Sequence, residues 1–134
     1  MIFTPENIEK IKTGQKTQTR RIIKVGETRL ANTPKYFRCV FSNGRLKWQI
    51  DKDYAVCPGR HQKQVARIVI TDIHSERLHH IQLHAAQAEG YESRAAFFSA
   101  WDKINPKHPV ASQPNVWVID FFLMPEGYKE MIGE

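Results

Sequence analysis

The segment Asn115–Phe122 constrains the fold more than any other part of the chain, because its apolar side chains follow one another almost without interruption. Successive side chains of an extended chain point to opposite faces, so this segment carries apolar groups on both. Near-continuous apolar segments are typical of strands that are covered on both sides. We therefore predict a strand that is buried on both faces through Val116, Trp117, Val118, Ile119 and Phe121.

A β-hairpin is predicted around Asn43-Gly44, since both residues tolerate the positive φ angles of a tight turn. Its strands are expected at Phe37–Phe41 and Arg45–Ile50. Residues 24–36 show no sustained period and are expected to form a long loop. The β-branched and apolar patterns predict further extended segments at Lys16–Ile23, Tyr54–Gly59 and Val65–Thr71.

Three helices are expected. Thr4 can cap the free backbone N–H groups of the first, and Pro5 suits its first position because the missing donor costs nothing there. Gly14 and Gly90 can each take the left-handed conformation that ends a helix, and Ser93 can begin one. The predicted helices cover residues 5–13, Leu83–Glu89 and residues 94–104.

The order of these elements predicts an α+β fold. A length of 134 residues favours one domain, with a core over residues 3–122 and a peripheral tail over residues 125–134. Many short strands, with helices at the ends of the series, favour a small mixed β-barrel over alternating βαβ units. We expect the helices to pack at the ends of this barrel.

Composition excludes several classes of protein. The mean hydropathy is −0.51 and no apolar run approaches the roughly 20 residues that cross a bilayer, so no membrane span is expected. The N-terminal segment lacks the pattern of a secretory signal, which predicts a cytoplasmic protein. Cys39 and Cys57 are too few for a disulfide framework and form no CxxC pair, so they are expected to be small core residues.

The charge is distributed unevenly along the chain. Residues 1–67 contain 15 lysines and arginines against 5 acidic residues, whereas residues 68–134 contain 5 against 9. A basic half of this kind can be solvated surface alone, but its field also attracts polyanions and anionic small molecules. The expected partner is a nucleoside, a nucleotide or RNA.

The densest set of reactive groups lies in Gly14–Arg21. A glycine turn is followed there by amine, hydroxyl and guanidinium groups, which suit the recognition of phosphate or carbonyl oxygen. The glycine spacing of a P-loop is absent. Alternatively, Gly14–Arg21 is not a recognition site but a basic edge strand, whose charges only prevent association with other strands.

The same segment resembles the G-x-K-T-x-T-x-R signature of the ASCH domain, a PUA-like β-barrel family. Further segments resemble the family's pattern in the expected order, so that the resemblance extends from Phe3 to Phe121. Residues 24–60 look like an added loop and hairpin. The further matching segments are Tyr54-x-Val56-x-Pro58-Gly59, Ala66–Thr71, Glu76–Leu78, Ala86-x-Ala88-Glu89-Gly90 and Val116–Phe121.

One branch of this family contains small amidohydrolases that remove acetyl from N4-acetylcytidine. The resemblance places their catalytic lysine, threonine and glutamate on Lys16, Thr19 and Glu89, and it implies neither a cofactor nor a metal. Lys16 would act as the base, Thr19 as the nucleophile or as the group that positions water, and Glu89 as the proton shuttle. Substrate-binding roles are expected for Arg20, Arg21, Thr17 and Trp48.

Residues 16 and 19 of a regular strand would point to opposite faces. Lys16 and Thr19 can therefore line one pocket only if the backbone is irregular near Thr17 and Gln18. An alternative for Glu89 is that it has no role in a site, because a glutamate next to Gly90 at a helix end can simply be exposed to solvent.

Other ASCH proteins are thought to bind RNA, which implies an alternative function. In a non-catalytic RNA-binding module the basic residues would contact phosphates, and Trp48 or Tyr36 could stack on a base. The candidate phosphate contacts are Lys16, Arg20, Arg21, Arg38, Arg45 and Lys47.

A histidine-rich stretch follows the predicted strand Val65–Thr71. His80 and His84 are four residues apart and could chelate a metal on one helix, but no third ligand stands at a recognised spacing. We expect His74, His79, His80 and His84 to be solvated or loop-anchoring residues beside Glu76, and no metal site.

Overall fold

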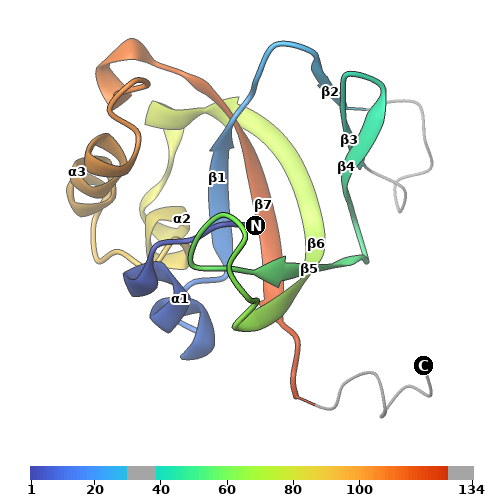
Figure 1. The fold of residues 1–134 in the computed structure, drawn as a ribbon. Coiled ribbons are helices and arrows are strands. Elements are labelled where there is room, and N and C mark those ends of the chain that lie inside the picture. Colours follow the sequence, from blue (N-terminus) through green and yellow to red (C-terminus); the bar gives the residue numbers. More distant parts are fainter. Residues whose placement is uncertain (30–38, 127–134) are drawn as a thin grey trace.

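The computed structural model describes residues 1–29 and 39–126, and within these ranges it contains two antiparallel sheets and three α-helices (Figure 1). The strands are β1 (Gln18–Ile22), β2 (Glu27–Arg29), β3 (Cys39–Ser42), β4 (Arg45–Gln49), β5 (Asp53–Val56), β6 (Ala66–Arg77) and β7 (Asn115–Leu123). The helices are α1 (Pro5–Lys12), α2 (Leu83–Ala88) and α3 (Arg94–Ile104), with short 3-10 turns η2 (Leu78–His80) and η3 (Val110–Ser112).

Strand β7 lies inside the larger sheet, whose order is β1-β7-β6-β5. Val116 and Val118 pack with α2 and α3 in one core cluster, while Trp117 and Ile119 belong to a second cluster with β3 and β4. Each of these four side chains is at most 4% exposed. The prediction of a strand buried on both faces is confirmed.

Strands β2, β3 and β4 form a second sheet, in that order. Asn43 and Gly44 have φ angles of 50° and 81°, so the predicted hairpin turn is confirmed. Val40 and Trp48 pack against Trp117 of the larger sheet. The predicted long loop over residues 24–36 is wrong at Glu27–Arg29, which forms β2, and Tyr36 and Arg38 lie outside the described residues.

Helices α2 and α3 pack on the face of β7 that carries Val116 and Val118, whereas α1 packs on the opposite face. The small sheet covers this second face, away from the helices (Figure 1). The backbone N–H of Asn7 donates to Thr4 Oγ1 over 3.3 Å, which confirms the N-cap of α1. Ile8 and Ile11 of α1 pack against Phe121. The predicted second and third helices are also present, and none of the described helices is long and apolar enough to cross a membrane.

The predicted barrel is wrong, because the two sheets do not close on each other. Strands β1 and β5 are opposite edges of the larger sheet, and an open sheet closes only when its edge strands pair. Helices α2 and α3 cover one face of this open sheet and α1 packs on the other, so the helices do not lie at the ends of a barrel. The α+β class itself is confirmed.

Strand β6 is longer than the predicted Val65–Thr71, since it continues to Arg77. Its second half is polar and follows an irregularity in pairing between Ile70 and Asp72, so it lacks the apolar pattern that identified the first half. This half carries His74 and Glu76, which therefore belong to the sheet.

Glu27 ties the small sheet to the larger one. Its side chain is fully buried, its Oε1 accepts hydrogen bonds from the Lys24 backbone N–H at 2.9 Å and from Trp117 Nε1 at 3.0 Å, and its Oε2 lies 2.5 Å from Lys47 Nζ. Burial alone would raise the pKa of Glu27, but these hydrogen bonds and the Lys47 charge hold that pKa below its usual value. The ionised carboxylate therefore stabilises the junction between the sheets.

Replacement Glu27→Gln should lower the free energy of unfolding at neutral pH by about 2 kcal/mol, because three donors lose an ionised acceptor. The lowered pKa means that this contribution is present above the usual glutamate pKa and is lost as pH falls through the folded-state pKa of Glu27. Urea unfolding from neutral to acidic pH should therefore show the difference shrinking in acid. A constant difference, or a similar loss in the exposed control Glu92→Gln, would contradict this role.

Candidate active site

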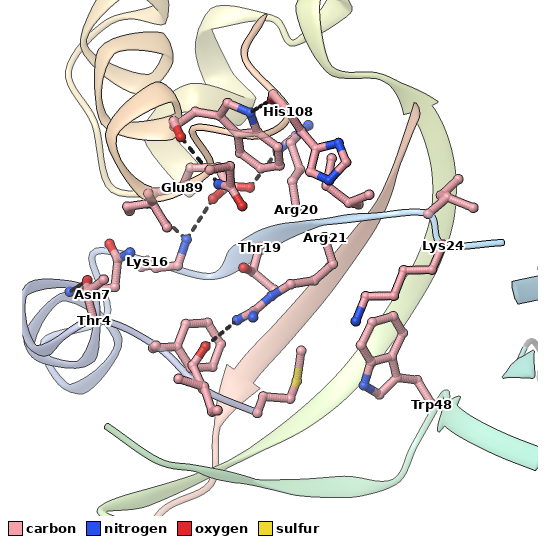
Figure 2. Close-up of a pocket in the computed structure, with 18 of the residues that line it drawn as sticks. Thr4, Asn7, Lys16, Thr19, Arg20, Arg21, Lys24, Trp48, Glu89 and His108 are labelled. Carbon is pink, nitrogen blue, oxygen red and sulfur yellow. Dashed lines mark hydrogen bonds and ion pairs between the residues drawn. The ribbon is translucent and has the colours of Figure 1, made fainter. Parts of the chain in front are cut away.

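A pocket of about 950 Å³ surrounds strand β1, and we call it the β1 pocket. Its wall is formed by the chain before α1, by β1 and the three residues after it, by the end of α3 and by β4 of the small sheet. Lys16 and Glu89 lie on the helix side of the pocket, and Lys24 and Trp48 lie on the opposite side (Figure 2). The pocket therefore has two ends of different composition.

Lys16 and Glu89 form a buried ion pair at the helix end. Lys16 Nζ lies 2.7 Å from Glu89 Oε1 and also donates to the Glu89 carbonyl oxygen over 3.3 Å. Each residue is 3% exposed, so the plain expectation of an exposed glutamate does not hold. Carboxylate and amine are in position to exchange a proton directly.

Two glycine turns bring this pair together. Gly14 ends α1 with a φ of 80°, after which the Thr17 N–H donates to the Ala88 carbonyl oxygen over 2.8 Å. Gly90 has a φ of 99°, and a Cβ atom there would lie 2.8 Å from Lys10 Cδ and 3.6 Å from Lys16 Cβ. The segment before β1 is thus held directly against the end of α2.

Arg20 fixes the other oxygen of Glu89. Its Nη1 lies 2.9 Å from Glu89 Oε2, while its Nε and Nη2 lie 3.0 Å and 2.6 Å from Glu76 Oε1. Nη1 also donates to Gln18 Oε1 over 2.5 Å, and the Arg20 side chain is 2% exposed. Its donors are therefore occupied by protein groups, and this geometry orients Glu89.

Glu76 and Gln18 are site residues that sequence reasoning missed. Glu76 is 56 residues from Arg20 in the chain, and only the sheet pairing brings it close. Gln18 Nε2 donates to Asp120 Oδ1 over 2.7 Å while its oxygen accepts from Arg20. The two-residue period of a strand places Gln18 on the same face as Arg20, but no spacing within the sequence could have identified Glu76 or Asp120 as partners.

Thr19 and Arg21 lie on the opposite face of β1 from Arg20, and both line the β1 pocket (Figure 2). Thr19 is 4% exposed, and its hydroxyl makes no hydrogen bond to any residue in the part of the chain that the structure describes. Strand β1 begins only at Gln18, so Lys16 precedes the regular strand. The expected break in strand geometry is present, and it lets Lys16 and Thr19 share one pocket.

Arg21 is held against the N-terminal segment. Its guanidinium carbon lies 4.6 Å from the ring centroid of Phe3, and its Nη2 donates to the Ile2 carbonyl oxygen over 2.8 Å. Its Nε is buried and has no hydrogen-bond partner among the described residues. The side chain therefore keeps unused donor capacity beside the pocket.

Burial lowers the pKa of Lys16, because desolvation disfavours the charged amine. Glu89 opposes this shift through its charge and hydrogen bond, while Arg21 and Arg20 add to it by repulsion between like charges. The net direction is downward. It favours the neutral amine that a general base requires.

Trp48 and Thr17 are placed differently from each other. Trp48 lines the pocket but is only 7% exposed, and Lys47 Nζ lies 4.4 Å from the centroid of its ring. It is packed in the core between the sheets, so it is not the freely exposed stacking surface of the RNA-binding alternative. Thr17 is exposed and does not belong to the pocket wall.

The histidines do not form one cluster. His80 lies in η2 and His84 in α2, so the pair does not share a helix. Within the described residues, His74 instead approaches Asp72 and Asp120, with one ligand atom from each inside 4.8 Å of the others. Such groups can bind a divalent cation, but Asp120 already accepts from Gln18 and no other feature points to a ligand. We assign no metal to this group.

Comparison with known proteins supports the fold. No family model and no curated protein matches the chain. An ASCH domain from Lactobacillus crispatus JV V101 matches it with a TM-score of 0.62 and 14% identity, over 88% of this chain and 70% of that one. A protein from Enterococcus faecalis V583, described with the family model DUF984, matches with a TM-score of 0.52 and 20% identity, over 88% of this chain and 69% of that one.

The chain therefore has an ASCH-like fold, as the sequence motifs predicted. At these identities the likeness concerns the fold alone. The roles of the side chains in the β1 pocket must be argued from their own geometry.

The buried network predicts coupling between Lys16 and Glu89. Replacement Glu89→Gln should lower the free energy of unfolding by roughly 3 kcal/mol, because two buried cations lose their shared counter-ion. The double variant with Glu89→Gln and Lys16→Met should lose less free energy of unfolding than the sum of the losses of the two single variants. We expect this difference, the coupling energy, to exceed about 1 kcal/mol. Urea unfolding of the four proteins measures this coupling, and additive changes would contradict it.

Proposed function

We propose that the protein hydrolyses the amide of an acylated nucleoside, such as N4-acetylcytidine, in the β1 pocket. The observation that carries the proposal is the buried Lys16–Glu89 pair in one pocket with Thr19, whose hydroxyl makes no hydrogen bond to a described residue. A nucleophile, a base and a proton carrier are the groups that amide hydrolysis requires. The motif resemblance to amidohydrolases supplies the class of substrate.

In the first half-reaction, Thr19 Oγ attacks the acetyl carbonyl carbon while neutral Lys16 accepts the hydroxyl proton. The C–N bond then breaks as a proton passes through the Lys16–Glu89 pair to N4 of the departing cytosine. Cytidine leaves, and an acetyl ester remains on Thr19. The 2.7 Å contact between Lys16 and Glu89 supports this relay.

In the second half-reaction, the same base takes a proton from water, whose oxygen attacks the ester. The ester bond breaks, the proton returns to Thr19 Oγ, and acetate leaves. A one-step variant replaces the ester by direct attack of water that Thr19 positions. Both routes consume one water and release cytidine and acetate.

The two arginines have different roles in this proposal. Arg20 is a positioning residue, because it holds Glu89 Oε2 and is itself held by Glu76. Arg21 orients the substrate through guanidinium N–H groups that the described protein residues leave free. The expectation that both arginines bind substrate thus stays a proposal for Arg21 alone.

The direct test is incubation of the purified protein with N4-acetylcytidine and chromatographic measurement of cytidine release. Thr19→Val retains the shape of the side chain but removes the hydroxyl, so kcat should fall at least about 100-fold. Lys16→Met and Glu89→Gln should lose activity similarly. Thr71→Val, a change on the exposed face of β6, is the matched control and should leave kcat within about twofold. No turnover by the folded wild-type protein would refute this substrate.

The base role of Lys16 predicts a rise of kcat/KM with pH. The neutral amine is the active form, so the rate should increase as pH passes the pKa of Lys16 and then level off, with a midpoint below the usual lysine value of about 10.4. Arg21→Gln should move this midpoint upward, because the Arg21 charge lowers the pKa of Lys16. A rate that falls through this range would instead indicate that protonated Lys16 is required.

The alternative is a non-catalytic RNA-binding module, as the sequence also allows. Arg45 is exposed on the hairpin and could contact phosphate, whereas Lys16 and Arg20 are buried and bound to Glu89. A module that reads phosphates should lose affinity steeply as salt rises, since counterions are released on binding. Salt-dependent RNA binding without hydrolysis would favour this alternative.

A further inference from the structure

The cations of the β1 pocket divide into two groups. Lys16 and Arg20 are neutralised by Glu89 and Glu76 at the helix end of the pocket. The side chains of Arg21 and Lys24 have no carboxylate partner within 4 Å among residues 1–29 and 39–126. The pocket therefore holds more positive charge than its own carboxylates balance.

Of the two unbalanced cations, Lys24 lies at one end of the pocket. Lys24 stands beside Trp48, across the pocket from the Lys16–Glu89 pair (Figure 2). The Lys24 backbone is anchored by the hydrogen bond from its N–H to Glu27 Oε1, while its side chain remains exposed. The same Glu27 holds Lys47, which also lines the pocket. The small sheet thus places lysines at the end opposite the reacting groups.

Arg21 lies between the two ends. Stacking on Phe3 and the bond to the Ile2 carbonyl oxygen fix its guanidinium plane, and its buried Nε lacks a partner. Holding a cation in this partly buried place with no carboxylate of the described residues within 4 Å costs free energy. An anion bound in the pocket would offset that cost.

We propose that the β1 pocket contains a phosphate subsite formed by Lys24 and Arg21, so that the preferred substrate is a phosphorylated form of the acylated nucleoside. This inference rests on the proposed function for the reacting end of the substrate. Lys24 follows Thr19 by five residues, and extended chain rises about 3.3 Å per residue, so the Cα atoms of Thr19 and Lys24 are at most about 17 Å apart. A nucleotide spans such a pocket with its acyl amide at Thr19 and its phosphate at Lys24.

Phosphate can reach this subsite as a free nucleotide or as part of an RNA strand. Both sources present the same charged oxygens to an ammonium and a guanidinium group. The experiment therefore compares three substrates: N4-acetylcytidine, its 5′-monophosphate, and a short oligoribonucleotide with one N4-acetylcytidine. A higher kcat/KM for the monophosphate would identify a free nucleotide as the source of the phosphate. A higher kcat/KM for the oligonucleotide would identify an RNA strand as that source.

The wild-type protein should hydrolyse at least one phosphorylated substrate with a kcat/KM about tenfold or more above that of the nucleoside. Lys24→Gln should remove most of this advantage through KM, and should leave hydrolysis of the nucleoside within about twofold. Lys63→Gln is the matched control, because Lys63 is an exposed lysine of the same basic half that does not line the pocket. Equal kcat/KM for all three substrates, or equal slowing of all three by Lys24→Gln, would overturn the subsite.

Binding gives a second readout that does not depend on turnover. Calorimetry should show tighter binding of cytidine 5′-monophosphate than of cytidine, and Lys24→Gln should abolish the difference. This preference without hydrolysis of any substrate would retain the phosphate subsite and refute the proposed reaction. Equal binding of the two ligands, or binding of neither, would refute the subsite.

Discussion

The carboxylate of Glu89 is the interaction on which the site depends. One oxygen holds Lys16 and the other holds Arg20, so a single side chain at the end of α2 fixes two cations that lie in or just before β1. Arg20 is held in turn by Glu76 from β6. Helix, edge strand and inner strand are thereby joined through charges, of which Lys16, Arg20 and Glu89 are buried and Glu76 is partly exposed.

Joining a helix to a sheet through buried charges costs free energy of desolvation. Removing charges from water costs free energy that their attraction returns only with good geometry, and apolar side chains often stabilise equally well. Buried groups with shifted pKa values are, however, what acid–base chemistry requires. The lowered pKa of Lys16, and a Thr19 hydroxyl that no described residue hydrogen-bonds in the same pocket, are consistent with a reactive site.

The pocket also depends on how the two faces of β7 are covered. Val116 and Val118 bury one face under α2 and α3, while Trp117 and Ile119 bury the other beneath the small sheet. Because β1 is an edge strand next to β7, its two faces open toward these two layers. Glu89 is thereby supplied from the helix layer, and Lys24, Lys47 and Trp48 from the region of the small sheet.

Local signals in the sequence determined the N-cap of α1, the Asn43-Gly44 turn, the apolar strand β7 and, through the motif resemblance, the Lys16, Thr19 and Glu89 set. These signals depend on backbone preferences within a few residues or on a motif of fixed spacing, so they can be identified without knowing the neighbours in space. Only the tertiary structure decided that the sheets stay open, that β6 continues through polar residues and that Trp48 is buried. It also decided that Arg20 forms an ion pair with Glu89 and so orients its carboxylate. Those outcomes depend on partners far apart in the chain, such as Arg20 and Glu89 at a separation of 69 residues, and sheet pairing alone brings Glu76 to Arg20.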